Sequence, residues 1–575
     1  MKQRIGAYLI DAIHRAGVDK IFGVPGDFNL AFLDDIISNP NVDWVGNTNE
    51  LNASYAADGY ARLNGLAALV TTFGVGELSA VNGIAGSYAE RIPVIAITGA
   101  PTRAVEHAGK YVHHSLGEGT FDDYRKMFAH ITVAQGYITP ENATTEIPRL
   151  INTAIAERRP VHLHLPIDVA ISEIEIPSLI NTAIAERRPV HLHLPIDVAI
   201  SEIEIPTPFE VTAAKDTDAS TYIELLTSKL HQSKQPIIIT GHEINSFHLH
   251  QELEDFVNQT QIPVAQLSLG KGAFNEENPY YMGIYDGKIA EDKIRDYVDN
   301  SDLILNIGAK LTDSATAGFS YQFNIDDVVM LNHHNIKIDD VTNDEISLPS
   351  LLKQLSNISH TNNATFPAYH RPTSPDYTVG TEPLTQQTYF KMMQNFLKPN
   401  DVIIADQGTS FFGAYDLALY KNNTFIGQPL WGSIGYTLPA TLGSQLADKD
   451  RRNLLLIGDG SLQLTVQAIS TMIRQHIKPV LFVINNDGYT VERLIHGMYE
   501  PYNEIHMWDY KALPAVFGGK NVEIHDVESS KDLQDTFNAI NGHPDVMHFV
   551  EVKMSVEDAP KKLIDIAKAF SQQNK

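Results

Sequence analysis

Short apolar runs that end at glycine, proline, asparagine or aspartate recur along most of this 575-residue chain. Examples are AALVTTFG from residue 67, DVIIADQG from residue 401 and PVLFVINND from residue 479. Runs rich in leucine and β-branched residues are typical of strands that are buried on both faces of a parallel sheet. Helical patterns separate the runs, so the sequence predicts the α/β class. The length exceeds one hydrophobic core, and three doubly wound parallel sheets would account for it.

Two segments interrupt this pattern and predict surface linkers. Residues 204–220 and 358–383 lack periodicity and are rich in proline, threonine and other turn-forming residues. The chain is therefore expected to divide into domains at residues 1–206, 207–371 and 372–575.

An identical repeat lies within the first of these domains. LINTAIAERRPVHLHLPIDVAISEIEIP occurs at 150–177 and again, letter for letter, at 179–206. Solenoid proteins need about three or more repeats, and their copies diverge, so two identical copies indicate a recent in-frame duplication. Each copy encodes one helix and one strand, and only one copy can fill a given place in a sheet. We expect that either copy can fill it and that the other is exposed.

Composition excludes several classes of function. The formal net charge is −27, and such a field repels phosphate backbones, so no nucleic-acid partner is expected. The chain has no cysteine, which excludes disulfides, thiolate nucleophiles and cysteine zinc sites. No apolar run reaches the length of about 18 residues that a membrane span requires. The first residues, MKQRIGAYLIDAIHRAG, predict an amphipathic helix rather than a signal peptide, so a cytoplasmic location is expected.

The strongest chemical pattern lies in the last third of the chain. The strand NLLLI runs into Gly458-Asp459-Gly460-Ser461, and a second buried strand ends at Asn486, in NNDGYTVE. Ligands of open α/β sheets collect at the carboxyl ends of strands, and a glycine-rich turn before a helix suits a diphosphate. Asp459, the amide oxygen of Asn486 and the carbonyl oxygen of Gly488 are hard ligands that suit Mg²⁺. Taken singly, GDGS is also a tight turn and NNDG a hairpin turn.

GDGS together with NNDGYTVE resembles the diphosphate- and Mg²⁺-binding motif of thiamine-diphosphate (ThDP) enzymes. The similarity covers nearly the whole chain apart from the duplicated block, and the pyruvate, indolepyruvate and branched-chain 2-keto acid decarboxylases are the members that the chain resembles. The resemblance implies non-oxidative decarboxylation of 2-keto acids to aldehydes and CO₂, with ThDP and Mg²⁺ as cofactors. It also implies that the three domains bind the pyrimidine, form a middle domain and bind the diphosphate, respectively.

Glu50 follows a predicted strand in NTNELNASYAADGYAR. By itself it is a first-turn helix glutamate of the kind that the helix dipole favours. The resemblance implies that it hydrogen-bonds the aminopyrimidine ring of ThDP and so promotes removal of the thiazolium C2 proton. Such a role needs a carboxyl group in a largely apolar pocket.

A catalytic set of two acids and two histidines is implied by the same resemblance. Asp27 lies in VPGDFN, the pair His113 and His114 in YVHHSLGEG, and Glu492 follows NNDGYT. Two acids and two imidazoles around one carbonyl carbon suit a reaction that protonates a carbanion and releases an alkoxide.

Other histidines are interpreted as structural. His333 and His334 form a second pair, which we assign to the core or the surface. His162 and His164 lie two apart on a predicted strand, and no partner ligands are evident in the sequence.

Further site residues follow from the resemblance alone. In FIGQPLWGSIGYT, Ile434 would hold ThDP in its bent shape, and the carbonyl of Gly432 would accept a hydrogen bond from the 4′-amino group. Phe411, Val491 and Ser314 would lie near the substrate side chain. ADQGTSFFG, residues 405–413, resembles the branched-chain and indolepyruvate members, so branched-chain and aromatic 2-keto acids are expected in preference to pyruvate. Apolar pockets discriminate by only about 1–3 kcal/mol per methylene, so overlap with pyruvate is expected. The family builds its site between two subunits, so a homodimer is the expected minimum and a homotetramer is common.

Several alternatives remain open at this point. One alternative is a pyruvate decarboxylase. A flavin-containing ThDP enzyme of the acetohydroxyacid synthase or pyruvate oxidase type shares the GDG motif and Glu50 but lacks the histidine pair. An inactive ThDP-binding protein would result if the duplication disrupts the first domain. A nicotinamide-dependent dehydrogenase is disfavoured, because Ser79 replaces the third glycine of the fingerprint that Gly74 and Gly76 would begin.

Overall fold

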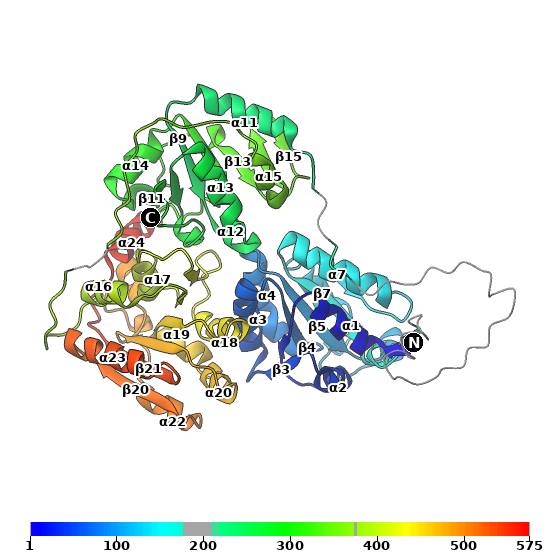
Figure 1. Ribbon diagram of the computed structural model, residues 1–575. Coiled ribbons are helices and arrows are strands. Elements are labelled where there is room, and N and C mark those ends of the chain that lie inside the picture. The colour runs from blue at the N-terminus through cyan, green and yellow to red at the C-terminus, as the bar shows by residue number, and fades with distance from the viewer. Residues whose placement is uncertain (1, 176–209, 213–215, 373–375, 574–575) are drawn as a thin grey trace. The chain divides into compact units, whose positions relative to one another are not determined.

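The computed structural model describes residues 2–175, 210–212, 216–372 and 376–573 (Figure 1). The chain divides into two compact units. The first is formed by residues 1–88 and 92–214, and the second by residues 89–91 and 215–575.

The first unit is built on a six-stranded sheet with the order β3-β2-β4-β5-β7-β6, in which every neighbouring pair is parallel. Figure 1 shows α3 and α4 on one side of this sheet and α1 and α7 on the other. Every residue of β4 and β5 is buried, which explains why their sequences are continuous apolar runs without alternation. The strands are β2 (Lys20–Gly23), β3 (Asp43–Gly46), β4 (Ala67–Thr72), β5 (Val94–Ala100), β6 (Ala134–Tyr137) and β7 (Val161–Pro166). The helices are α1 (Ile5–Arg15), α2 (Leu30–Ser38), α3 (Glu50–Asn64), α4 (Val75–Ala89), α5 (Arg103–His107), α6 (Asp123–Phe128), α7 (Ala143–Glu157) and α8 (Ile167–Ala170).

The first copy of the repeat supplies part of this sheet. Residues 150–177 contribute the second half of α7 and the whole of β7, which pairs with β5 and β6. They also contribute β8 (Glu173–Glu175), which pairs antiparallel with β1 (Lys2–Arg4). The second copy, 179–206, lies outside the described residues, so its expected exposure stays a prediction.

Deleting residues 178–206 should leave a folded, active protein, because the first copy already fills the strand position between β5 and β6. We expect circular dichroism and thermal unfolding to match those of the full chain. Leu163→Asp in the shortened chain is the control: Leu163 is fully buried on β7, and a charge there should cost about 3–5 kcal/mol or more of stability. A shortened chain that does not fold would show that the second copy is required.

The second unit contains a seven-stranded sheet with the order β11-β10-β9-β12-β13-β14-β15. Its pairs are parallel from β11 to β13, and β14 and β15 extend one edge as antiparallel strands. The strands are β9 (Pro236–Thr240), β10 (Val264–Gln266), β11 (Tyr281–Ile284), β12 (Leu303–Ile307), β13 (Val329–Asn332), β14 (Asn335–Ile338) and β15 (Val341–Asn343). Its helices are α11 (Ser220–Gln232), α12 (His242–Phe247), α13 (His250–Thr260), α14 (Asp292–Asp299) and α15 (Leu348–Leu355).

The same unit contains a third sheet, fully parallel, with the order β17-β16-β18-β19-β21-β20. Helices α16 and α23 pack together, and so do α18 and α20. The strands are β16 (Val402–Ala405), β17 (Thr424–Ile426), β18 (Asn453–Gly458), β19 (Val480–Asn485), β20 (Val522–Val527) and β21 (Met547–Lys553). The helices are α16 (Gln386–Phe396), α17 (Thr409–Ala414), α18 (Thr437–Ala447), α19 (Asp459–Thr465), α20 (Ala468–Arg474), α21 (Thr490–Ile495), α22 (Leu513–Val516), α23 (Ser530–Gly542) and α24 (Lys561–Gln573).

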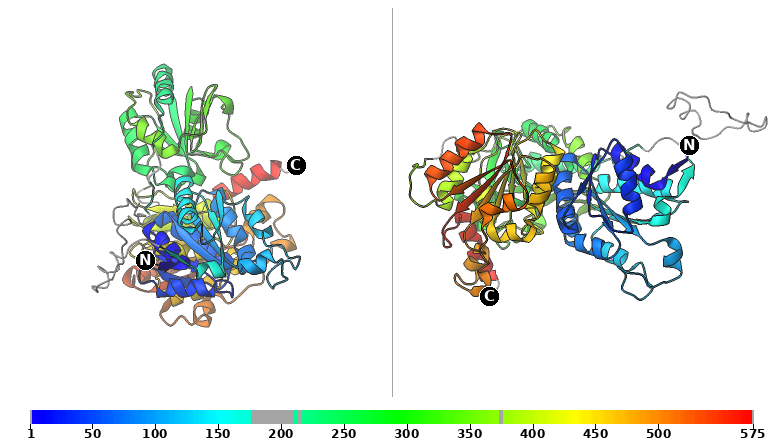
Figure 2. Two further views of the ribbon diagram at one scale, coloured as in Figure 1. Left: turned by 90° about the vertical axis from the view of Figure 1, so that its right-hand side faces the viewer. Right: turned by 90° about the horizontal axis from the view of Figure 1, so that it is seen from below.

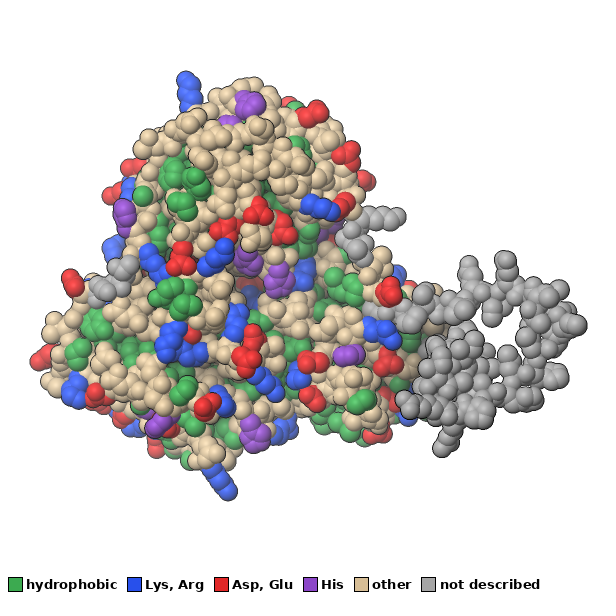
Figure 3. Space-filling model, viewed as in Figure 1, with side chains coloured by type: hydrophobic (Ala, Val, Ile, Leu, Met, Phe, Trp, Pro, Cys, Tyr) green, Lys and Arg blue, Asp and Glu red, His purple; other side chains and the backbone are tan. Residues whose placement is uncertain are grey.

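Three parallel-dominated sheets with helices confirm the predicted α/β class, and the further views in Figure 2 show the strands of the sheets lying side by side. Within the described residues, no helix is both long enough and apolar enough to cross a membrane. On the face shown in Figure 3, acidic and basic side chains are interspersed.

Candidate active site

The carboxyl ends of β2 to β5 carry the predicted residues of the first unit, because parallel strands all end at the same edge of a sheet. Asp27 lies in the loop that follows β2. Asn29 fixes this loop: its side-chain oxygen accepts from the backbone N–H of Gly26 at 2.9 Å, and its amide donates to the carbonyl of Val24 at 3.1 Å. Asn29 is fully buried, so the loop is anchored in the core.

The histidine pair lies directly against this loop. His113 donates from Nε2 to Asp27 Oδ2 at 2.6 Å, and His114 Nδ1 lies 3.9 Å from Asp27 Oδ1. The ring of His113 stacks on Phe28 with centroids 4.9 Å apart, and the ring of His114 meets the same phenyl edge-on. The structure therefore brings Asp27 together with the two histidines, although the acid is 86 or more positions away from them in the chain.

A turn at Gly74 holds the second histidine in place. Gly74 has φ +64°, and a Cβ at this position would overlap the carbonyl oxygen of His114. That carbonyl also accepts a hydrogen bond from the hydroxyl of Tyr124 at 3.1 Å. The backbone N–H of Gly74 donates to Glu77, which is 1% exposed. Only glycine allows this close approach at a left-handed φ, so Gly74, the first glycine of the rejected dinucleotide fingerprint, serves the histidine loop instead.

Glu50 is the first residue of α3, after the N-cap Asn49, whose side chain accepts from the N–H of Asn52 at 2.7 Å. Gly76 lies beside it: a Cβ there would come within 3.3 Å of Glu50 Oε1. Burial raises the pKa of Glu50 above its usual value, and hydrogen bonding at its own backbone opposes that shift. The carboxyl group is therefore partly withdrawn from water, as proton sharing requires.

In the second unit the carboxyl edge of the third sheet carries the diphosphate motif. Asp459 follows β18 directly and is fully buried. Its carboxylate accepts from the backbone N–H of Gly460 at 2.8 Å and of Gly488 at 3.2 Å, so it joins the loops after β18 and β19. Burial raises the pKa of Asp459 to about 6, and the backbone N–H donors oppose that shift. A buried carboxylate of this kind is stabilised by a bound cation.

Asn486 and Glu492 follow β19. The amide of Asn486 donates from Nδ2 to the hydroxyl of Thr490 at 2.7 Å, so its oxygen is the atom that can act as a ligand. The guanidinium of Arg493 donates to the carbonyl of Asn486 at 3.1 Å and braces this loop. Glu492 lies in the first turn of α21, and burial raises its pKa.

Asp406 is a buried acid at the same sheet edge that the sequence analysis did not single out. It follows β16, is fully buried, and accepts from the hydroxyl of Thr437 at 2.6 Å and from the backbone N–H of Gly435 at 3.2 Å. Ser461 also hydrogen-bonds it and lowers its pKa, which burial raises. Asp406 thus ties the loop at 432–435 to the GDGS turn. The signal was its position after a buried strand in ADQG, like that of Asp459 in IGDG.

Two glycines at this edge leave their surroundings open. A Cβ added at Gly432 or at Gly458 would meet no atom within 4 Å. Gly432 has φ +70°, and its N–H donates to the carbonyl of Gln428 at 2.7 Å. Ile434 is partly exposed in the same loop. The backbone at these glycines can therefore approach a ligand closely.

The predicted substrate-pocket residues occupy three separate elements of the second unit. Phe411, in α17, is 2% exposed and belongs to the core around the third sheet, against which Val491 packs partly buried. Gly408 lies beside Val491: its Cβ would come 4.0 Å from Val491 Cγ2. Ser314 follows β12, in a loop whose Ala317 joins the same core.

His162, His164 and His333 occupy buried positions. His162 hydrogen-bonds Thr98 at 3.0 Å and stacks on Phe128, and His164 hydrogen-bonds Glu106 at 2.8 Å. His333 is 3% exposed, and its Nδ1 accepts from the N–H of Leu348.

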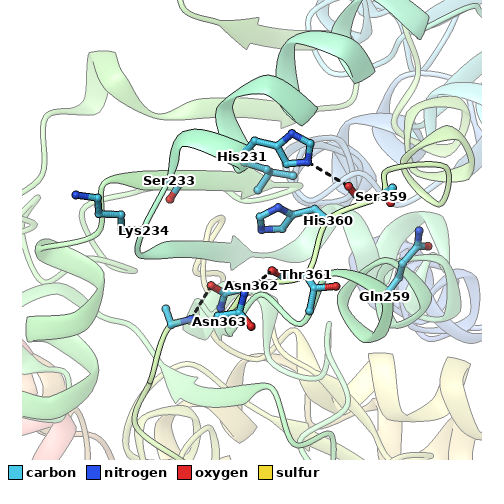
Figure 4. A pocket seen from close by; sticks show the side chains of 11 residues that line it. His231, Ser233, Lys234, Gln259, Ser359, His360, Thr361, Asn362 and Asn363 are labelled. Atoms are coloured by element: carbon cyan, nitrogen blue, oxygen red, sulfur yellow. Dashed lines mark hydrogen bonds between the residues drawn. The ribbon is translucent and has the colours of Figure 1, made fainter.

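A polar pocket of about 700 Å³ lies elsewhere, beside the second sheet (Figure 4). His231, Gln259 and His360 are among its lining residues, and none of the predicted site residues lines it. It therefore contributes nothing to the candidate site.

The residues present fit ThDP with Mg²⁺. Asp459, Asn486 and the carbonyl of Gly488 would offer the hard oxygen ligands that Mg²⁺ prefers, and the open backbone at Gly458 suits a diphosphate. The half-buried carboxyl group of Glu50 would hold the pyrimidine.

Comparisons with protein families identify the class of enzyme. Three family models match: the N-terminal TPP binding domain of thiamine pyrophosphate enzymes at residues 3–125, the central domain at 223–355 and the C-terminal TPP binding domain at 406–552. Thiamine pyrophosphate is another name for ThDP. The fold and the site thus define a ThDP enzyme.

Full-length relatives then specify the family. An alpha-keto-acid decarboxylase of Mycobacterium leprae is 36% identical over 574 residues, which cover 99% of this chain and 96% of the relative. Pyruvate decarboxylase isozyme 3 of Saccharomyces cerevisiae is 38% identical over 580 residues, which cover 99% of each chain. The chain belongs to the family of ThDP-dependent 2-keto acid decarboxylases. Members are carboxy-lyases that use Mg²⁺ with ThDP, so the predicted enzyme class and cofactors are confirmed.

Proposed function

We propose that this enzyme decarboxylates 2-keto acids with branched-chain or aromatic side chains to aldehydes and CO₂. The observation that carries the catalytic assignment is the cluster in which Asp27 binds His113 at 2.6 Å, with His114 alongside. The substrate preference is supported by the resemblance of ADQGTSFFG, residues 405–413, to the branched-chain and indolepyruvate members of the family, and by the apolar side chains of Phe411 and Val491. Pyruvate is the second candidate, because two relatives at 38% identity are named pyruvate decarboxylases.

The chemistry divides between the bound cofactor and the side chains. When bound, ThDP supplies the electron sink that accepts the electron pair left as CO₂ departs. Glu50 would hold and exchange a proton at its carboxyl oxygen, a role that burial supports by raising its pKa above the usual value.

The two histidines handle the substrate protons. Asp27 accepts from Nε2 of His113 and stacking on Phe28 fixes the ring plane, so His113 is oriented before substrate arrives. His114 is held through its backbone carbonyl by Tyr124. With Glu492, these groups orient the carboxylate, protonate the carbon that loses it and take the hydroxyl proton as the aldehyde leaves.

Asp459, Asn486 and the carbonyl of Gly488 are proposed to hold Mg²⁺, with Gly458, Gly460 and Ser461 around the diphosphate and Gly432 and Ile434 beside the rings. We retain 1–206, 207–371 and 372–575 as the proposed pyrimidine, middle and diphosphate domains. The cytoplasmic location stays a prediction.

Aldehyde release by the purified chain with ThDP and Mg²⁺ tests the function. The substrates are pyruvate, 3-methyl-2-oxobutanoate, 4-methyl-2-oxopentanoate, phenylpyruvate and indolepyruvate. A higher kcat/KM for the larger acids supports the proposal, and a preference for pyruvate selects the second candidate. No aldehyde from any substrate, in a folded chain that binds ThDP, would overturn both.

The assembly is proposed to be a homodimer at minimum, and a homotetramer in its complete form. Each active site would take Asp27, Glu50 and the histidines from one subunit and the diphosphate motif with Glu492 from the other. This follows the family resemblance, and each compact unit carries one of the two residue sets.

Mixing two inactive variants should therefore restore activity. A hybrid dimer of Glu50→Gln and Glu492→Gln subunits contains one site with both substitutions and one with neither. Random exchange after co-expression should give about a quarter of the wild-type activity. Each variant alone is the control. A mixture no more active than its components would show that both glutamates act in the same subunit's site.

A further inference from the structure

A cluster of three histidines and one glutamate lies at the edge of the third sheet, on strands that carry none of the residues of the candidate active site. Glu523 and His525 lie two positions apart on the edge strand β20, so both side chains project from the same face of the sheet. His548, on β21, is the registered partner of Glu523. Figure 1 shows β20 and β21 side by side. His543 lies at the end of α23, just before β21.

The three side chains on the strands point their donor atoms at one another. Nε2 of His525 lies 3.1 Å from Nδ1 of His548, and Oε2 of Glu523 lies 3.8 Å from the same Nδ1. All three donor atoms lie within 4.8 Å of one another. Zinc–nitrogen bonds of about 2.0–2.1 Å that meet at a tetrahedral angle place two nitrogens about 3.3–3.4 Å apart. The two separations at Nδ1 of His548, 3.1 and 3.8 Å, therefore need adjustments of only a few tenths of an ångström.

A backbone carbonyl fixes the tautomer of His548 in which Nδ1 can bind a metal ion. Its Nε2 lies 2.9 Å from the backbone carbonyl oxygen of His543, which can only accept, so Nε2 carries the proton. Nδ1 therefore presents its lone pair to His525 and Glu523. Fixing a ligand histidine through its other nitrogen is the usual second layer of a metal site.

The carboxylate is fixed in the same way. Nδ1 of His543 lies 2.6 Å from Oε1 of Glu523, which leaves Oε2 directed to the histidine pair. His548 is 1% exposed, whereas the side chains of Glu523 and His543 are 35% and 64% exposed. One side of the cluster is thus rigid and buried, and the other is open to an ion from solvent.

We propose that Glu523, His525 and His548 form a binding site for a divalent transition-metal ion, with Zn²⁺ the best match. Two imidazoles and one carboxylate are the ligand types that borderline ions prefer, in contrast to the all-oxygen set proposed for Mg²⁺. Without metal, Nε2–H of His525 donates to Nδ1 of His548. When the ion binds, His525 shifts to its Nδ1–H tautomer by proton exchange with solvent, with no net loss of a proton, and the lone pairs of both nitrogens bind the ion. A water completes the tetrahedron, and the ion clamps the edge strand β20 to β21.

Equilibrium dialysis of the holoenzyme against Zn²⁺, with ThDP and Mg²⁺ present throughout, tests this site. Wild type should retain one more equivalent of Zn²⁺ per chain than His525→Gln. His360→Gln is the matched control, because His360 also lies beside a second histidine, His231, with ring centroids 5.7 Å apart, and it should retain as much as wild type. The difference between variants subtracts any ion held by Asp27 and its histidines, which also approach metal-ligand spacing.

Glu523→Gln supplies an independent readout. The midpoint of thermal unfolding should rise with Zn²⁺ in wild type and in His360→Gln, and it should not rise in Glu523→Gln or His525→Gln. Circular dichroism establishes that each variant is folded. Equal Zn²⁺ retention by wild type and His525→Gln, or an equal rise of the midpoint in all four proteins, would overturn the proposal.

Discussion

Glu50→Gln will lower kcat for aldehyde release by about 100- to 10,000-fold, the range that loss of a positioned acid–base group produces. Glutamine keeps the size and hydrogen bonding of the side chain but cannot take up or release a proton. Burial raises the pKa of Glu50 above its usual value, which makes the wild-type carboxyl group a better proton acceptor than an exposed glutamate. Steady-state assays with the best substrate measure kcat, and isothermal titration checks that ThDP still binds.

The control separates catalysis from the role of a first-turn acid. Glu252 is likewise in the first turn of a helix, α13, but it is exposed. A helix-dipole contribution is worth about 0.3–1 kcal/mol, so Glu252→Gln should change stability slightly and kcat hardly at all. If Glu50→Gln retained kcat within a factor of about three, Glu50 would be only a helix-terminal residue.

Asp459→Asn will weaken Mg²⁺-dependent ThDP binding by more than about 100-fold. Loss of a group that hydrogen-bonds a metal ligand lowers metal affinity by about 10- to 100-fold, and loss of the ligand itself should cost more. The substitution removes the negative charge, and its NH₂ group would face the N–H donors of Gly460 or Gly488. Calorimetric titration of the apoprotein with ThDP at fixed Mg²⁺ measures the effect.

Two observations distinguish lost binding from lost folding. The folded-state pKa of Asp459 is about 6, above the usual value for aspartate. In the metal-free protein the ionised carboxylate therefore lowers the free energy of unfolding. This loss grows as the pH rises from the usual pKa of aspartate to about 6. Apo Asp459→Asn should therefore unfold at or above the wild-type temperature at pH 7. Asp487→Asn, an exposed neighbour with the same charge change, should bind ThDP nearly as wild type does. Similar losses in both variants would argue against direct coordination by Asp459.

The sequence by itself predicted the class of fold and the family. Strands such as β4 and β18 are buried nearly throughout, and burial on both faces requires the continuous apolar runs that are visible in the sequence. The GDGS and NNDGYT segments follow such strands, and they lie together because parallel strands end at one edge. Local pattern was sufficient wherever the chemistry depends on residues close in the chain.

Only the tertiary structure decided the contacts between distant segments. The bond between His113 and Asp27, the overlap that makes Gly74 necessary beside His114, and the position of Asp406 depend on how strands and loops pack. The two copies of the repeat are identical, so no sequence pattern distinguishes them, and the strand position between β5 and β6 is filled by the first. The cluster of Glu523 and His548 likewise exists only through the register of β20 on β21. Sequence sets the local preferences, and packing determines which distant groups meet.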